Sequence, residues 1–378
     1  MTVKTGLDVL LNTQLDLLLG QRVGVVTHPA AVTANLVGIV DALRAADVNL
    51  TALFGPEHGF DGSAADGAAV QDAVHPRTGL PIYSLYGVTQ TPTSAMLNAV
   101  DALIFDMQDV GVRFYTYLST LFHVLRGAAQ IGKAVIVLDR PNPINGVTLE
   151  GPPVTPACIS FVGILPIPIR HGMTLGELAR YMNGEYALGA DLTVIAMQGW
   201  ARARYFAETG LPWVPTSPAM SHLNATLLYP GLCFLEGCNI SAGRGTSLPF
   251  EICGAPWIDA YALGEALNAL VLPGLRVNPT QFTPCSGKFA DELCYGVQFH
   301  VTQRDALRPV TLGLYLIATL HRMYPQRFSW RASHFDQLIG NTQVRAALER
   351  GERVADIVST WPKTLVEFDQ VRTPYLLY

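Results

Sequence analysis

The regular alternation of short apolar runs with segments of helical periodicity constrains the first half of the chain most strongly. The apolar runs have the length of strands, whereas the segments between them repeat apolar residues with the helical period. Strands and helices that alternate in this way form a parallel sheet with crossover helices. We therefore predict an α/β fold with a doubly wound parallel sheet. Strands are expected at residues 22–27, 50–54, 81–86, 102–105, 133–138 and 192–197, and helices at 35–46, 94–100, 114–130 and 174–186.

The pattern changes after a proline-rich segment, residues 209–218, which predicts a crossing between domains. A chain of 378 residues is also too long for one compact core. We predict a first domain at residues 1–212 and a smaller α+β domain at residues 213–378 that closes a cleft. In the second part, the sequence indicates helices at 260–270 and 314–323 and a strand at 297–301.

Composition excludes several classes of function. The net charge is −5 and there is no run of Lys or Arg, which argues against a nucleic-acid partner. No apolar stretch reaches the length of a membrane span, and the start lacks the pattern of a signal peptide. We expect a cytoplasmic protein as the sequence stands, or a periplasmic or secreted one if a leader has been removed. The six cysteines show neither CxxC pairs nor zinc-like spacing, so we expect buried free thiols and no metal.

The segment that follows the second predicted strand carries a carboxylate beside an imidazole. A Gly55-Pro56 turn ends the strand, and Glu57 and His58 follow directly. Turn residues hold the next side chains on a fixed support, at the strand end where α/β proteins build their sites. Glu57 is therefore our candidate for a general acid, and the alternative is a solvated loop glutamate.

Polar residues follow the other predicted strands in the same way. Because the carboxyl ends of parallel strands share one edge of a sheet, these side chains predict a single cleft for a polar ligand such as a carbohydrate or a phosphate. Some of these side chains have a structural role as the alternative to binding a ligand. Arg140 can pair with Asp139, Asp109 can cap the next helix, and His28 can orient a turn. The candidates at these strand ends, besides Glu57 and His58, are His28, Tyr86, Asp106, Asp109, Arg113, Arg140 and Asn142.

Later segments add further candidates. Arg170 and His171 precede a helix that begins with a capping box. Glu236, Asn239 and Arg244 lie in glycine-rich loops, where Arg244 is suited either to bind a carboxylate bidentately or to brace the loop. The chain lacks the GxGxxG, GxxxxGK[ST], GxSxG and HExxH motifs, so dinucleotide, P-loop, serine-hydrolase and zinc-protease readings have no support.

Several longer motifs are jointly specific. FGPEHGF, TGLPIYSLYG, DMQDVGVRFYTY, VLDRPNP, RHGMTLGELA and the terminal YLLY run in order along nearly the whole chain. Together they resemble the NamZ-type exo-β-N-acetylmuramidases, a glycoside hydrolase family once catalogued as a domain of unknown function. The chain departs from the usual motifs at Ala219 and Cys238.

The resemblance implies a Rossmann-like domain joined to an auxiliary domain, and release of N-acetylmuramic acid from the non-reducing end of peptidoglycan fragments during cell-wall recycling. It implies Glu57 as the catalytic acid, and no cofactor is needed. Asp106 is our candidate for a second carboxylate; the rival is assistance by the sugar's own 2-acetamido group. His58 is placed to orient Glu57.

The lactyl carboxylate of N-acetylmuramic acid calls for a cation, and Arg244, Arg113 and Arg170 are the candidates. The substrate is expected to be a small muropeptide-derived saccharide, and the oligomeric state is left open. Two alternatives use the same cleft: a non-catalytic muropeptide-binding protein and a metal-dependent hydrolase.

Overall fold

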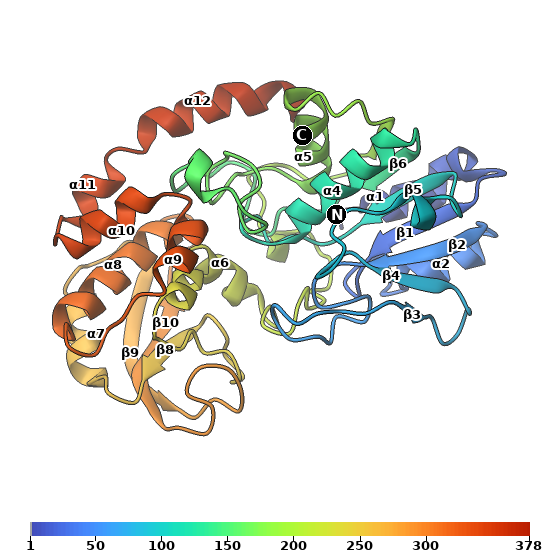
Figure 1. Ribbon diagram of the computed structural model, residues 1–378. Helices are drawn as coiled ribbons and strands as arrows, with labels where there is room; N and C mark the ends of the chain where they lie inside the picture. The colour runs from blue at the N-terminus through green and yellow to red at the C-terminus, as the bar shows by residue number, and fades with distance from the viewer. Residues whose placement is uncertain (1) are drawn as a thin grey trace.

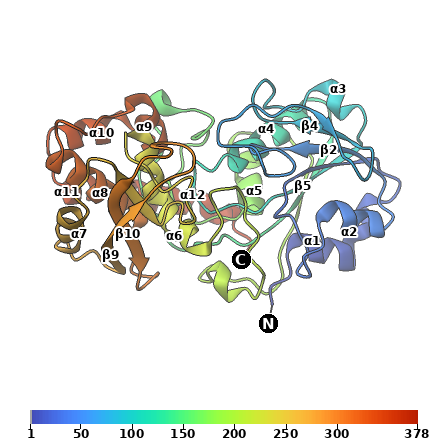
Figure 2. The same ribbon diagram turned by 90° about the horizontal axis from the view of Figure 1, so that it is seen from below.

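The computed structural model describes residues 2–378, which form two domains lying side by side (Figure 2). The first domain holds a seven-stranded sheet in the order β3-β4-β2-β1-β5-β6-β7, parallel except where β3 runs antiparallel to β4. Without β3, this is the 3-2-1-4-5-6 order of a Rossmann-like sheet. The predicted fold class is confirmed. The strands are β1 (Val23–Thr27), β2 (Leu50–Gly55), β3 (Ala73–Val74), β4 (Pro81–Ser84), β5 (Ala102–Asp106), β6 (Ala134–Leu138) and β7 (Leu192–Ile195).

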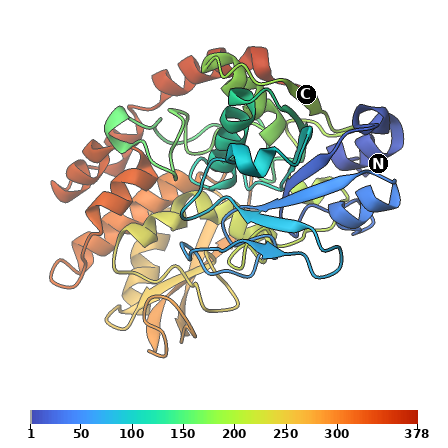
Figure 3. The same ribbon diagram turned by 45° about the vertical axis from the view of Figure 1, so that its right-hand side comes forward.

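Side chains of the central strands alternate between two apolar cores, one on each face of the sheet. Val25 and Ile104 belong to the core under α1 and α2, whereas Val26 and Phe105 belong to the core under α4 and α5. Figure 3 shows the blue helices on one side of the sheet and the teal and green helices on the other. Successive side chains of a strand point to opposite faces, and both faces are buried here, so the strand sequences are continuous apolar runs. The helices are α1 (Gly6–Val9), α2 (Ile39–Ala45), α3 (Ser94–Leu97), α4 (Tyr117–Gln130) and α5 (Leu175–Glu185).

The second domain contains a three-stranded antiparallel sheet, β8-β10-β9, with helices packed beside it. The predicted α+β character is confirmed, although only β10, α7 and α8 were expected. Helices α6 and α8 meet at Gly231 and Gly313, where a Cβ on either residue would collide with backbone. The elements are β8 (Ile252–Ala255), β9 (Leu275–Phe282), β10 (Cys294–Val301), α6 (Leu223–Leu232), α7 (Ala260–Asn268), α8 (Pro309–Met323), α9 (Ala332–Ile339), α10 (Thr342–Glu349) and α11 (Val354–Val358).

The C-terminal end of the chain returns to the first domain. Helix α12 (Pro362–Arg372) crosses over the top of the molecule in Figure 1 and brings the terminus beside α5. We call residues 372–378 the C-terminal clasp. The division between residues 212 and 213 stays a prediction, and residues 372–378, which it assigns to the second domain, pack on the first.

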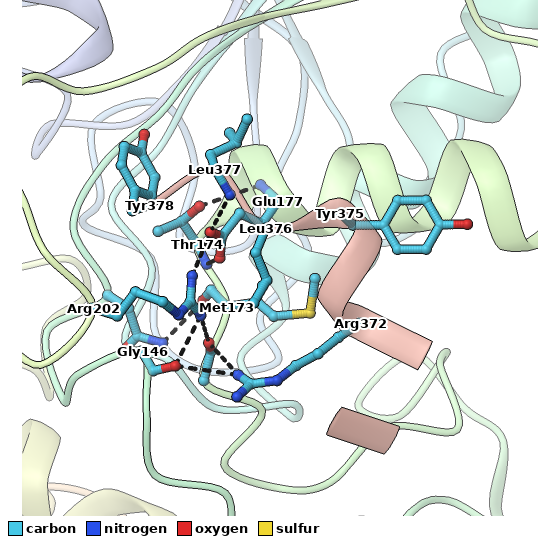
Figure 4. Close-up of polar contacts among 12 residues, drawn as sticks. Gly146, Met173, Thr174, Glu177, Arg202, Arg372, Tyr375, Leu376, Leu377 and Tyr378 are labelled. Carbon is cyan, nitrogen blue, oxygen red and sulfur yellow. Dashed lines mark hydrogen bonds and ion pairs between the residues drawn. The ribbon is translucent and has the colours of Figure 1, made fainter. Parts of the chain in front are cut away.

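Polar contacts hold the clasp in place (Figure 4). Arg372 donates to the carbonyl of Gly172 over 2.6 Å, and the backbone amide of Leu377 donates to Oε1 of Glu177 over 2.9 Å. The hydroxyl of Tyr378 donates to Oδ2 of Asp139 over 2.8 Å. Within residues 2–378, no helix has the length and apolar character needed to cross a membrane.

Candidate active site

A cavity of about 310 Å³ lies between the two domains, at the carboxyl end of β2. It gathers three carboxylates, two imidazoles and two guanidinium groups. Larger hollows of about 620, 470 and 440 Å³ contain neither Glu57 nor His58, so we place the chemistry in the smaller one. The polar residues of the smaller cavity are Glu57, His58, Asp66, Tyr86, Tyr115, Thr116, Ser217, Tyr229, Glu236, Arg244, Arg331 and His334.

Glu57 sits in a tight turn that ends β2. The backbone amide of Gly59 bonds to the carbonyl of Pro56 over 3.0 Å, and His58 has a φ of +70°, which is uncommon for a residue with a side chain. Glu57 as a residue is only 9% exposed. Thr116 Oγ1 donates to its Oε2 over 2.7 Å, and the amide of Gly67 donates to its Oε1 over 3.0 Å. The carboxyl group is therefore held in one orientation at the cavity wall.

His58 braces the loop that covers this glutamate. Its Nδ1 lies 2.8 Å from the carbonyl oxygen of Ala64, and its Nε2 lies 3.7 Å from Oδ1 of Asp66. The next residue, Gly67, supplies the amide that bonds to Glu57. His58 thus contacts the loop whose Gly67 amide bonds to Glu57.

Tyr86 supplies a neutral hydroxyl to the same cavity. Burial, together with the nearby Glu57 carboxylate, raises the pKa of Tyr86 to about 12. The phenol therefore stays protonated at neutral pH and can donate a hydrogen bond to a ligand.

Charges from both domains meet at Arg244. Its Nε donates to Oε1 of Glu236 over 2.6 Å, its Nη1 forms an ion pair with Asp66, and its guanidinium lies 4.8 Å from the centre of the Phe250 ring. Burial raises the pKa of Glu236, but Arg244 and His334 outweigh it and bring the pKa down to about 2. Glu236 is therefore an anion at physiological pH.

Comparisons with known proteins show which family the chain belongs to. The family described as exo-beta-N-acetylmuramidase NamZ matches residues 23–224 with its N-terminal part and residues 227–378 with its C-terminal part. The chain belongs to the NamZ family. It is 46% identical to the peptidoglycan beta-N-acetylmuramidase NamZ of Bacillus subtilis (strain 168), over all of this chain and 91% of that protein.

Two solved structures from Bacteroides fragilis NCTC 9343, both described as DUF1343 family proteins, share this NamZ architecture. One has a TM-score of 0.93 and 37% identity, and the other a TM-score of 0.81 and 32% identity. Each comparison covers all of this chain and 99% of the solved chain. The resemblance drawn from the motifs is therefore confirmed.

Five of the predicted site residues line the cavity of this NamZ-family chain: Glu57, His58, Tyr86, Glu236 and Arg244. Asp106 does not, because it is fully buried and both its oxygens bond to Arg140, over 2.5 Å and 2.8 Å. The tips of β5 and β6 are neighbours, and they turn these two side chains toward each other. Asp106 is therefore not placed to act as the second carboxylate. The ion-pair partner of Arg140 is Asp106.

Three further candidates lie in buried polar positions outside the cavity. His28 accepts a hydrogen bond from the Gln108 amide over 2.9 Å, and burial lowers its pKa to about 3. Asp109 accepts from the amide of Gly111 over 2.7 Å, and burial raises its pKa to about 7. His171 lies 3.9 Å from Asp109, and burial lowers its pKa to about 3.

The side chains of the other four candidates donate hydrogen bonds to backbone carbonyl groups. Arg113 donates to the carbonyls of Pro152, Ile167 and Leu338, so the wall of the second domain is tied to the first. Arg170 donates to the carbonyl of Ile144, Asn142 to that of Met173, and Asn239 to that of Arg327. Neither Arg113 nor Arg170 is placed to bind a substrate carboxylate in the cavity.

Sequence reasoning missed Asp66, Thr116, Tyr229, Arg331 and His334 as cavity residues. Thr116 lies inside the DMQDVGVRFYTY motif, so the motif offered a signal for it. Asp66 lies in a loop without periodic pattern, and Arg331 and His334 reach the cavity only because α9 packs beside η5 (Cys233–Gly237).

Proposed function

We propose that this chain is an exo-acting β-N-acetylmuramidase that releases N-acetylmuramic acid from the non-reducing end of peptidoglycan fragments. The observation that carries the proposal is Glu57, held by Thr116 and Gly67 in a cavity between two domains of the NamZ family. The Bacillus subtilis relative carries the name of this activity.

The size of the cavity supports attack at a chain end. Its volume of about 310 Å³ lies at the lower end of the range of roughly 300–1,000 Å³ found for small-molecule sites. Such a cavity suits one sugar residue better than a long stretch of glycan. We propose a muropeptide-derived saccharide as the substrate, with its terminal residue in the cavity.

Glu57 acts as the general acid in this proposal. Its proton passes to the glycosidic oxygen while the bond from that oxygen to C1 breaks and positive charge develops on the sugar ring. Thr116 and Gly67 fix the two carboxyl oxygens, so the proton is delivered in a defined direction. Water then completes the hydrolysis, and Glu57 recovers its proton from that water.

The second group is supplied by the substrate. Asp106 lies outside the cavity and bonds to Arg140, and the two carboxylates that share the cavity with Glu57, Asp66 and Glu236, pair with Arg244. No carboxylate in the described residues of the cavity is thus left unpaired opposite Glu57. We propose that the 2-acetamido oxygen of the sugar bonds to C1 in the first step and is displaced by water in the second.

A chromogenic β-glycoside of N-acetylmuramic acid tests the proposal. Turnover by the wild-type chain is expected to be insensitive to EDTA, and Glu57→Gln is expected to lower kcat by about 10²–10⁴-fold with an unchanged melting temperature. EDTA-sensitive turnover would favour a metal-dependent hydrolase, and binding without turnover a muropeptide-binding protein. Near-normal turnover by the Glu57→Gln variant would remove Glu57 from the role of acid.

A further inference from the structure

The proposed substrate carries a negative charge that glucosamine residues lack. That charge lies on the lactyl carboxylate, which hydrogen bonds from a guanidinium can recognise through two parallel contacts. The cavity contains two guanidinium groups, from Arg244 and Arg331. Which of them is available to a ligand depends on the partners that each already has.

Arg244 is already neutralised within the protein. It pairs with Glu236 over 2.6 Å and with Asp66, and its guanidinium stacks on Phe250. Its side chain is 25% exposed. To bind a substrate carboxylate, Arg244 would have to give up ion pairs of equal charge, so it contributes little net attraction for an anion.

Arg331 is in the opposite situation. Among residues 2–378, no carboxylate lies within ion-pair distance of its side chain, and that side chain makes one long hydrogen bond, 3.3 Å, to the backbone carbonyl of Glu236. Its backbone amide donates to the carbonyl of Gly237 over 2.8 Å, which fixes the start of α9. A guanidinium has five N–H donors, so most of those of Arg331 are open to a ligand.

The two ends of the site come from different domains. Glu57 follows β2 of the first domain, whereas Arg331 directly precedes α9 of the second, and both line the same cavity. His334 lies one helical turn beyond Arg331, on the same side of α9, with its Nε2 4.0 Å from Oε2 of Glu236. A sugar that fills the cavity can therefore meet the acid from the first domain and, from the second, a cation that has no carboxylate partner among residues 2–378.

We propose that Arg331 binds the lactyl carboxylate and sets the preference of the site for muramic acid over neutral amino sugars. The inference rests on the proposed function and names the recognition element of the same site. Arg331 replaces Arg244 in the role that the sequence predicted for Arg244, which instead ties Asp66 to Glu236.

Paired substrates and paired variants test Arg331. The substrates are the 4-nitrophenyl β-glycoside of N-acetylmuramic acid and its lactyl amide, which has the same shape without the charge. The variants are Arg331→Ala, Arg331→Lys and the control Arg327→Ala, whose exposed side chain lies outside the cavity. Thermal melting checks that each variant is folded.

Arg331→Ala is expected to lower kcat/KM for the acid about 10- to 100-fold, because one charged hydrogen-bonded contact is lost. Its kcat/KM for the amide should stay within about 3-fold of wild type, since the amide offers no charge for Arg331 to recognise. Arg331→Lys should recover part of the loss, and Arg327→Ala should match wild type on both substrates.

An equal loss on both substrates, or no loss on the acid, would overturn the role of Arg331 while leaving the proposed function intact. A wild-type chain that hydrolyses neither substrate would instead overturn the proposed function, and this inference with it. The two failures are therefore distinguishable in one set of assays.

Discussion

The hydroxyl of Thr116 lies 2.7 Å from Oε2 of Glu57 and makes no hydrogen bond to the helix that it precedes. Thr116 occupies the N-cap of α4, where a threonine ordinarily accepts a hydrogen bond from the first turn and stabilises it. Here the side chain bonds instead to a glutamate of another loop. Helix α4 therefore lacks the stabilising cap, and the same hydroxyl positions one carboxyl group instead. Such a local conflict is typical of a functional site.

We expect Thr116→Val to lower kcat about 10- to 100-fold, because the nearly isosteric valine removes the hydrogen bond that orients Glu57. KM should change by less than about 3-fold, since the cavity keeps its shape. The melting temperature should stay close to that of wild type, because the hydroxyl does not cap α4. Thr116→Ser keeps the donor and is the matched control. Steady-state kinetics with unchanged kcat in Thr116→Val would show that Glu57 needs no help from Thr116.

The ion pair between Asp66 and Arg244 joins a loop of the first domain to a loop of the second. Asp66→Asn should raise KM about 3- to 10-fold, because the loop that carries Gly67 loses its tie to the opposite wall. Stability should fall by less than about 1 kcal/mol, since the side chains are 44% and 25% exposed and water screens the pair.

Salt gives a second readout of the same pair. Added NaCl should raise KM of wild type more than KM of Asp66→Asn, because screening weakens an ion pair that the variant no longer has. Asp61→Asn, an exposed change in the same loop, should behave like wild type. Identical salt dependence in Asp66→Asn and wild type would argue that the pair does not close the cavity.

The strand pattern predicted the sheet well because it depends on local features. Each expected strand of the first domain is present, and the alternation of Val25 and Val26 between two cores explains their continuous apolar character. Glu57 was found for a similar reason, since a Gly-Pro turn after a buried strand places a side chain at the carboxyl edge.

The remainder of the site depends on tertiary contacts. Asp106 does end a central strand, but the strand-end rule does not say which way a side chain points, and a neighbouring strand end supplies Arg140 as its partner. Arg331 lies 274 residues from Glu57 in the sequence, so only the packing of the two domains brings both to one cavity. The clasp could not be predicted from the sequence either, because it forms only when distant parts of the chain pack together.

Buried Asp109 predicts a pH dependence of stability. Burial raises its pKa to about 7 in the folded chain, from an ordinary value of 3.8. Between these values the native state holds a proton that the unfolded chain releases, so this contribution to stability is complete below about pH 4 and is lost as pH rises through 7.

Asp109→Asn removes this titration and keeps an oxygen to accept from Gly111. The melting temperature of Asp109→Asn relative to wild type should therefore rise between pH 5 and pH 8, by a few degrees. Thermal melting of both proteins across this range, with Asp61→Asn as the exposed control, measures the difference. A constant difference at every pH would mean that Asp109 ionises at the same pH in the folded and unfolded chains.

Tyr378 ends the clasp with a hydroxyl that has two partners. It donates to Oδ2 of Asp139 over 2.8 Å and accepts from the backbone amide of Met197 over 2.7 Å, while its ring contacts Trp200 edge-on. Tyr378→Phe keeps the ring contact but leaves the Met197 amide without an acceptor and Asp139 with one donor fewer. Such losses cost about 1–3 kcal/mol.

We therefore expect Tyr378→Phe to melt several degrees below wild type and to unfold at lower urea concentration. Its kcat at 25 °C should be unchanged, because Tyr378 does not line the cavity. Tyr375→Phe is the matched control: its hydroxyl bonds over 2.7 Å to an exposed partner, Glu185, so its loss should cost less than about 0.5 kcal/mol. Equal melting temperatures for the two variants would show that the buried end of the clasp contributes no more to stability than its exposed part.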